Sequence, residues 1–185
     1  MADQNNVGST GEQEVPKPKE EIIKEALRIE QSTMIVAKSH FIYAQFWSAF
    51  HLWLGIPTTI LAAGVASALI KADKSGVAIF VSTLVPALTA VATFLNPIKK
   101  ASDHLKAGNA YLALNDKTRI FRTIDCWGAD SVNVLTKRLK DLAEEKSKLN
   151  RESPQPPAWT YEAAKRGIKK GEADFDVDQN RDLPA

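Results

Sequence analysis

The side chains of this chain that could do chemistry are few, and their spacing excludes most kinds of site. His40 and His51 are eleven residues apart, which is about 16 Å along a helix and too far for the two rings to share a metal ion. His104 follows two lysines, and we expect it to pack or to be solvated. The sequence has no Gly-rich phosphate loop, no nucleophile elbow and no cluster of metal ligands. It therefore predicts no catalytic residue, no cofactor and no metal, and so a protein that is not an enzyme.

Two single residues keep more than one interpretation. Cys126 is the only cysteine, so the chain cannot form an internal disulfide. A reactive thiol needs a basic neighbour that favours the thiolate, and we expect Cys126 to be a reduced, partly buried side chain. His51 lies among aromatic residues at the edge of an apolar stretch, where an ionisable group is a functional candidate. The alternative is an imidazole that hydrogen-bonds water or lipid.

The elements that position these residues are two long stretches without Asp, Glu, Lys or Arg. They are Phe41–Ile70 and Val77–Ile98, and only Lys71–Gly76 separates them. A helix needs about 20 mostly apolar residues to cross the hydrocarbon core of a membrane. A loop this short makes the second helix return antiparallel to the first. The pattern predicts a hairpin of two transmembrane helices at about residues 47–70 and 77–98.

The first stretch is longer than one crossing requires. Its thirty residues at about 1.5 Å each exceed a core of roughly 30 Å, so we expect Phe41–Phe50 to lie in the interface. Trp and Tyr favour the headgroup level because their rings are amphipathic. The sequence therefore predicts membrane-interface aromatics at Tyr43, Trp47 and Trp53.

The second stretch carries an ordered row of polar residues. Spacings of four, three, four and three place them on one helix face, namely Ser82, Pro86, Thr89, Thr93 and Asn96. A weaker row in the first stretch includes His51, Gly55 and Thr58. Such rows are typical of a pore lining and equally of a helix-packing face, where small and hydroxyl residues let backbones approach. The two rows could also face each other within one hairpin.

The flanks of the hairpin are polar and helical. We expect cytoplasmic helices at about residues 19–40, 99–127, 130–151 and 160–170, a disordered leader at residues 1–18 and an acidic, disordered tail at residues 172–185. The first of these helices should run into the membrane without a break, because no Pro or Gly occurs between Lys19 and Gly55. The apolar a and d positions of Val132–Leu149 could pack on the chain's own bundle or join neighbouring chains. The fold class is therefore all-α, a transmembrane hairpin continuous with a cytoplasmic helical bundle.

The distribution of charge orients the hairpin. Basic residues are more numerous near the flank ends of the hairpin than in the loop, which holds only Lys71 and Lys74. Those on the flanks are Arg28, Lys38, Lys99, Lys100 and Lys106, and Lys99 and Lys100 would lie at the inner mouth of any ion path. The positive-inside rule then places both flanks in the cytoplasm and the protein in the cell membrane as a multi-pass chain. A formal net charge of +2, with no basic run interleaved with aromatics, argues against nucleic-acid binding.

Three segments taken together resemble a known family. They are Ser39–Trp47 at the entry to the first span, Asn96–Leu114 at the exit from the second, and Pro157–Lys165. Their order is similar to that of the SLATT family of two-span membrane effector domains. The resemblance covers about Glu20–Gly171, and we therefore place a SLATT-like domain at residues 19–171. The motifs are packing residues and not a catalytic signature.

The resemblance implies a function for the whole chain. Members of the family are thought to be oligomeric effectors of prokaryotic conflict and defence systems that form pores or disrupt the membrane. The implied partners are the lipid bilayer, further copies of the chain, and a linked sensor or nucleotide second-messenger synthase. The alternative is a membrane-anchored scaffold that recruits a cytoplasmic partner without ion flux.

Overall fold

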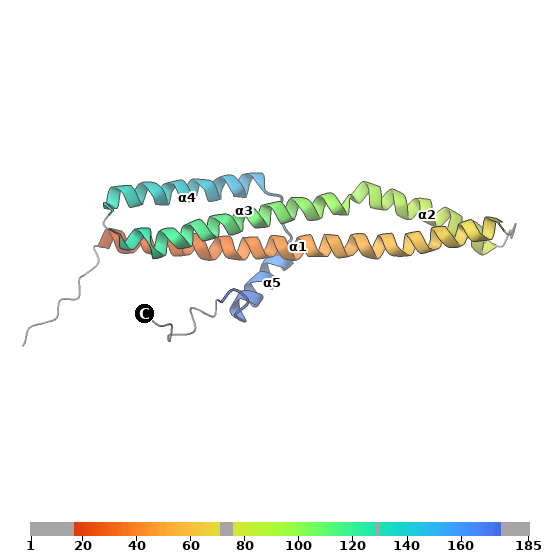
Figure 1. Cartoon of the computed structure of the whole chain (residues 1–185), viewed down its shortest axis with the longest axis horizontal. Helices are drawn as coiled ribbons and strands as arrows, with labels where there is room; N and C mark the ends of the chain where they lie inside the picture. The colour runs from red at the N-terminus through yellow and green to blue at the C-terminus, as the bar shows by residue number, and fades with distance from the viewer. Residues whose placement is uncertain (1–16, 71–75, 129, 175–185) are drawn as a thin grey trace, which may run out of the picture.

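The chain is all-helical wherever its structure is described. The computed structural model describes residues 17–70, 76–128 and 130–174. These residues form five α-helices and a short 3-10 helix η1 (Asp125–Trp127), shown in Figure 1. The α-helices are α1 (Lys17–Ile70), α2 (Gly76–Leu95), α3 (Pro97–Thr123), α4 (Val132–Glu152) and α5 (Ala158–Lys169). Most of the predicted leader, the loop before Gly76 and the tail after Asp174 lie outside the described residues.

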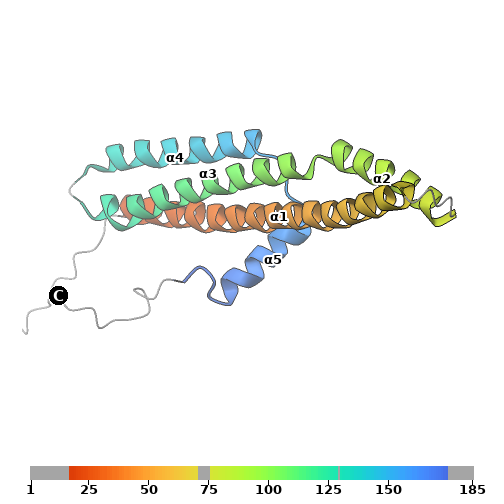
Figure 2. The ribbon, with the colours of Figure 1, turned by 45° about the vertical axis from the view of Figure 1, so that its right-hand side comes forward.

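The 54-residue helix α1 is the axis of the molecule. At 1.5 Å per residue it is about 80 Å long, and the prediction that it continues unbroken from the bundle into the apolar stretch is confirmed. Helices α2 and α3 follow one another along the same side of α1 (Figures 1 and 2). One end of the molecule is therefore a bundle, and the other is an antiparallel pair of α1 and α2.

Helices α2 and α3 do not form one continuous helix. Asn96 separates them with a left-handed backbone (φ 44°, ψ 61°), and its side chain accepts a hydrogen bond of 3.2 Å from the backbone N–H of Lys99. A residue before proline avoids the helical region, and asparagine tolerates the left-handed one. The predicted second span, residues 77–98, therefore ends at Leu95, and Pro97 begins the next helix.

The bundle end has an apolar core that joins four elements. Ile22 and Ala26 of α1, Phe121, Cys126 and Leu135 are buried together. Leu135 belongs to α4, and Val132, Leu139 and Leu142 pack against the same cluster. The a and d face of α4 therefore packs on its own chain, which was one of the two expectations for it. Cys126 is buried more fully than the partial burial expected for it.

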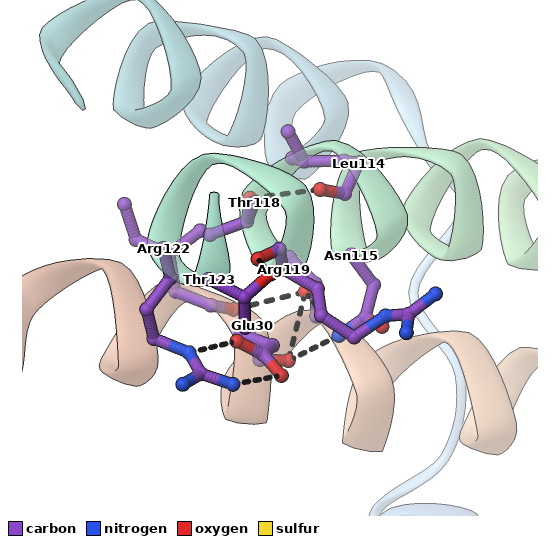
Figure 3. Close-up of polar contacts among 9 residues, drawn as sticks. Glu30, Leu114, Asn115, Thr118, Arg119, Arg122 and Thr123 are labelled. Carbon is purple, nitrogen blue, oxygen red and sulfur yellow. Dashed lines mark hydrogen bonds and ion pairs between the residues drawn. The ribbon is translucent and has the colours of Figure 1, made fainter. Parts of the chain in front are cut away.

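Polar contacts fix α3 against α1 beside this core (Figure 3). The Arg122 guanidinium donates two hydrogen bonds to the Glu30 carboxylate, at 2.7 and 3.2 Å. The buried Asn115 amide donates to the backbone carbonyl of Glu30 at 2.6 Å. Each bond joins residues more than eighty positions apart, so the register of α1 and α3 is set by paired polar groups as well as by packing.

Helix α5 packs on α1, on the side of the molecule away from α4 (Figures 1 and 2). It buries Thr160, Ala164 and Gly167. Beyond its end, Glu172 pairs with the Lys38 ammonium group of α1. Residues 172–174 at the start of the predicted tail thus lie against α1, and the rest of that tail lies outside the described residues.

Candidate functional site at the base of the apolar hairpin

The α1–α2 pair has an outer surface that is apolar and exposed. Trp53 of α1 is 80% exposed and Phe94 of α2 is 89% exposed, and the exposed large hydrophobic residues of the described chain concentrate between Phe46 and Ile98. Among the described residues, one helix is long and apolar enough to cross a membrane, over Pro18–Gly64, with a mean hydropathy of 1.2 in its most apolar window. Only 6% of that window is buried. Helix α2 is 20 residues long and contains no Asp, Glu, Lys or Arg.

The predicted polar row on α2 faces away from α1. Ser82, Pro86, Thr89 and Thr93 are exposed, whereas Leu84, Leu88 and Leu95 on the other side are half-buried. Because α1 is the helix that packs along α2, the rows of the two helices do not face each other. Asn96 leaves the row, since it caps α3. The four remaining residues are available to another molecule.

The hydroxyl groups of this row are bonded to their own helix. Ser82 donates to the Ile79 carbonyl at 2.8 Å, and Thr89 donates to the Val85 carbonyl at 2.9 Å. Thr93 donates to the Thr89 carbonyl at 2.8 Å. Each hydroxyl oxygen keeps its lone pairs for a donor from outside the helix.

Aromatic rings gather where the bundle meets the hairpin. Tyr43 stacks on Phe46 at 5.8 Å between ring centroids and meets Trp47 edge-on at 5.8 Å. Trp159, the second residue of α5, meets Tyr43 at 6.1 Å and Phe46 at 5.9 Å. Tyr43 and Trp47, two of the predicted membrane-interface aromatics, therefore lie together, and Trp159 joins them from a helix that the sequence prediction did not connect with these rings. Trp53, the third predicted interface aromatic, follows Trp47 along α1 and is part of the exposed apolar surface.

The two predicted inner-mouth lysines both contact other side chains, and one of them contacts a ring of this cluster. The Lys100 ammonium group lies over the Trp47 ring, 4.3 Å from its centroid. Lys99 pairs with Asp103 at 2.6 Å, and this contact lowers the pKa of the Asp103 carboxyl. An exposed pair of this kind contributes little to stability, but it halves the positive charge that Lys99 and Lys100 would present to an ion.

Two histidines meet directly beneath the aromatic cluster. The Nδ1 atoms of His40 (α1) and His104 (α3) are 2.9 Å apart, and the side chains are 1% and 5% exposed. Tyr111 stacks on His40 at 5.6 Å, and Tyr43 meets His104 edge-on at 4.7 Å. One Nδ1 donates its proton to the other, so the pair holds one shared proton between the two helices.

The environment of the pair disfavours a second proton. Burial, followed by the charge of His104, lowers the pKa of His40 from 6.5 to about 4. Burial also lowers the pKa of His104, against a smaller opposing effect of Asp103. Two protonated rings at this separation would present N–H to N–H and repel each other. Near neutral pH both rings are neutral and the hydrogen bond is intact.

The sequence contained a signal for this pair that our interpretation of single residues missed. His40 is 31 residues before Lys71, and His104 is 28 residues after Gly76. In an antiparallel hairpin, residues at similar distances from the loop lie opposite each other. The distance between His40 and His51, its neighbour in sequence, carries no information about this pair. His51 itself is half-buried, in a hollow with Gly55 and Thr59, and the histidine pair does not include it.

The base of the hairpin thus combines an exposed apolar surface, an aromatic belt and a buried pair of proton-sharing side chains. Among the described residues, no group of three or more His, Cys, Asp or Glu side chains could hold a metal ion. No family model, no curated protein and no solved structure matches this chain.

Proposed function

We propose that this chain is a membrane protein whose α1–α2 hairpin lies in the bilayer, with the bundle in the cytoplasm. The observation that carries the proposal is the exposed, uncharged surface of the hairpin. Large apolar patches of a folded protein mark sites that are covered by lipid or by another protein. A core helix of a water-soluble domain would be mostly buried, whereas the most apolar window of α1 is 6% buried.

The aromatic belt supports the same proposal. Tyr43, Trp47 and Trp159 come from two separate helices, and they lie at the level where the charged bundle gives way to the uncharged pair. Trp and Tyr rings prefer this boundary of a bilayer. Lys100 beside Trp47 is a suitable partner for lipid phosphate groups at the cytoplasmic face.

We further propose that several copies assemble and that the hydroxyl row of α2 lines a pore between them. Two helices cannot enclose a water-filled path, so a pore requires a homo-oligomer. Thr89 and Thr93 point away from α1 and are exposed in the single chain. The resemblance to SLATT effectors is the ground for placing such a pore in a prokaryotic-type defence system, with a linked sensor or second-messenger synthase as partner.

One observation favours the alternative, a membrane-anchored scaffold without ion flux. The hydroxyl protons of Ser82, Thr89 and Thr93 are already bonded to carbonyls of α2. Hydroxyls satisfied in this way need no water, and they can lie between packed helices. In this alternative, the bundle or the chain beyond α5 recruits a cytoplasmic partner.

Release of a trapped dye from liposomes separates the two functions. The purified full-length chain is reconstituted at increasing protein-to-lipid ratios, and membrane insertion is verified by flotation and resistance to carbonate extraction. A pore-forming oligomer is expected to release the dye with a steep dependence on protein density. Insertion without release at any density would overturn the pore and leave the scaffold. Failure to float with the liposomes would overturn the membrane proposal itself.

A further inference from the structure

The contact between Lys100 and Trp47 contains two hydrogen-bond donors and no acceptor. The Lys100 ammonium group lies over the indole ring, 4.3 Å from its centroid. The indole Nε1–H of Trp47 is buried, and no described residue accepts a hydrogen bond from it. Buried donors are almost always paired with the protein or with ordered water. This N–H therefore lacks an acceptor that the described chain does not supply.

The charge of Lys100 is not compensated by a carboxylate in the described part of the chain. Lys100 is exposed. Asp103, the acidic residue closest to it in sequence, is bonded to Lys99 at 2.6 Å. Hydrogen bonds from an ammonium group to phosphate oxygens are among the strong ones, so the exposed cation is suited to a phosphate group.

The start of α3 adds to the positive potential at this contact. Helix α3 begins at Pro97, beside the hairpin, and its first turn contains no acidic residue (Figure 2). The N-terminal end of a helix carries a partial positive charge of roughly half an elementary charge. Lys100 is the fourth residue of the helix, so its ammonium group and the helix end attract an anion to the same region.

Exposed apolar side chains lie on the hairpin side of this contact. Phe94, near the end of α2, is 89% exposed, and Ile98 is 59% exposed. They precede Lys100 by only six and two residues. A ligand that matches both features has a negatively charged head and an apolar body, and a free phosphate ion has only the first.

We propose that the contact between Lys100 and Trp47 binds the phosphate group of an anionic phospholipid whose headgroup carries no cation, such as phosphatidylglycerol. As the ammonium group turns from the ring to the phosphate, the indole N–H gains the acceptor that it lacks. The acyl chains lie on Phe94 and Ile98. A choline headgroup brings a second cation to a region that is already positive, so phosphatidylcholine binds more weakly. The inference rests on the proposed place of the hairpin in the bilayer, but it does not require a pore.

Thermal unfolding of the full-length chain in detergent micelles with added lipid tests the proposal. A ligand that binds the folded state raises the Tm in a saturable way. The probes are dioleoyl phosphatidylglycerol, dioleoyl phosphatidylcholine, and glycerol 1-phosphate, which has a charged group but no acyl chains. The apparent Kd is expected to be at least tenfold lower for phosphatidylglycerol than for phosphatidylcholine, with no effect of glycerol 1-phosphate. Equal effects of the two lipids would overturn the site, and an equal effect of glycerol 1-phosphate would overturn a lipid as its ligand.

Variants at three positions assign the effect to this contact. Lys100→Gln is expected to weaken phosphatidylglycerol binding at least tenfold. Lys106→Gln, the matched control, removes the same charge from another exposed position of α3, and it is expected to change binding less than twofold. Trp47→Phe keeps a ring but removes the N–H, and it is expected to weaken binding at least threefold. Circular dichroism verifies that the variants are folded. Equal losses in the two lysine variants would show a diffuse attraction of anions and overturn the site.

Flotation with liposomes separates a failure of this inference from a failure of the proposed function. A chain that floats with liposomes of phosphatidylcholine alone but shows no preference for phosphatidylglycerol is a membrane protein without this site. A chain that floats neither with these liposomes nor with liposomes containing phosphatidylglycerol would overturn both.

Discussion

The hydrogen bond between His40 and His104 depends on both rings remaining neutral. Burial at the α1–α3 contact removes the water that would stabilise an imidazolium ion, and a charge on one ring opposes a charge on the other. Between the rings, one Nδ1 must donate and the other must accept. The pair therefore senses the addition of a proton as the loss of a contact between the two helices.

This pair makes the stability of the bundle pH-dependent. The pKa of His40 is lowered to about 4 in the folded chain but is 6.5 when unperturbed, so the unfolded state binds more protons between these values. Stability is therefore greatest above pH 6.5 and falls as the pH decreases towards 4. Denaturant unfolding in detergent, followed by circular dichroism from pH 7.5 to pH 4, is expected to show this loss.

Histidine variants assign the effect to the pair. His40→Phe combined with His104→Phe keeps an aromatic ring at both positions and removes both titrating groups, so the loss between pH 6.5 and pH 4 is expected to disappear. His51→Phe, outside the pair, is expected to keep it. A pH profile unchanged by the double variant would mean that carboxyl groups, and not these imidazoles, cause the loss.

At the scale of the element, one close contact of α3 with α1 depends on a glycine, Gly108. A Cβ atom placed on Gly108 would lie 2.7 Å from Cε1 of Phe41. Contacts that short do not occur in real proteins, so Phe41 or the helix would have to shift. Without a side chain at Gly108, the two helices approach closely just beneath the aromatic belt.

Gly108→Ala is therefore expected to destabilise the bundle. Alanine in a helix normally stabilises by about 0.5–1 kcal/mol relative to glycine, but overpacking costs about 1–3 kcal/mol, and the second effect is the larger. Thermal unfolding should show a lower Tm. Gly55→Ala is the control, since nothing lies within 4 Å of its added Cβ. A variant at Gly108 with a Tm equal to or above that of the wild type would contradict the close approach.

The helices were predictable from the sequence, but their breaks and contacts were predictable only in part. The three–four spacing of apolar residues identified α1 and α4, because burial of one face is local information. The end of α2 was misplaced because Asn96 fitted the polar row, although the Asn96–Pro97 pair favours a break. The place of Trp159 in the aromatic belt could not be predicted, because it depends on where α5 returns after the proline-rich segment before Ala158.

For the whole molecule, the decisive property is the orientation of the hairpin in a membrane. Cys126 was the natural internal reporter in the sequence, but it is buried, and burial raises the pKa of its thiol. It is therefore expected to stay unlabelled on either side of a membrane. Labelling of the wild-type chain is therefore expected to be low, so that the labelling of a variant reports on its introduced cysteine.

Labelling of introduced cysteines tests the proposed topology. A cysteine at Ser75, in the predicted loop, should react with an impermeant maleimide in intact cells. A cysteine at the exposed Ser147 of α4 should react only after the cells are opened. The reverse pattern would mean that the hairpin has the opposite orientation in the membrane. Reaction of both cysteines in intact cells would mean that the bundle lies outside the cell.

The hydroxyl row of α2 is the feature on which a pore and a scaffold differ most. If Thr89 and Thr93 line a water-filled path, replacing each by leucine makes the wall apolar and favours a dewetted constriction. Thr89→Leu and Thr93→Leu are therefore expected to reduce dye release from liposomes at least tenfold, with membrane insertion unchanged. Leu88→Ile, on the half-buried side of the same helix, should alter release less than twofold. Because neither span contains Asp, Glu, Lys or Arg, the wild-type path should discriminate weakly between cations and anions. If both leucine variants release dye as fast as the wild type, the row is a packing face between copies, and the path must lie elsewhere or not exist.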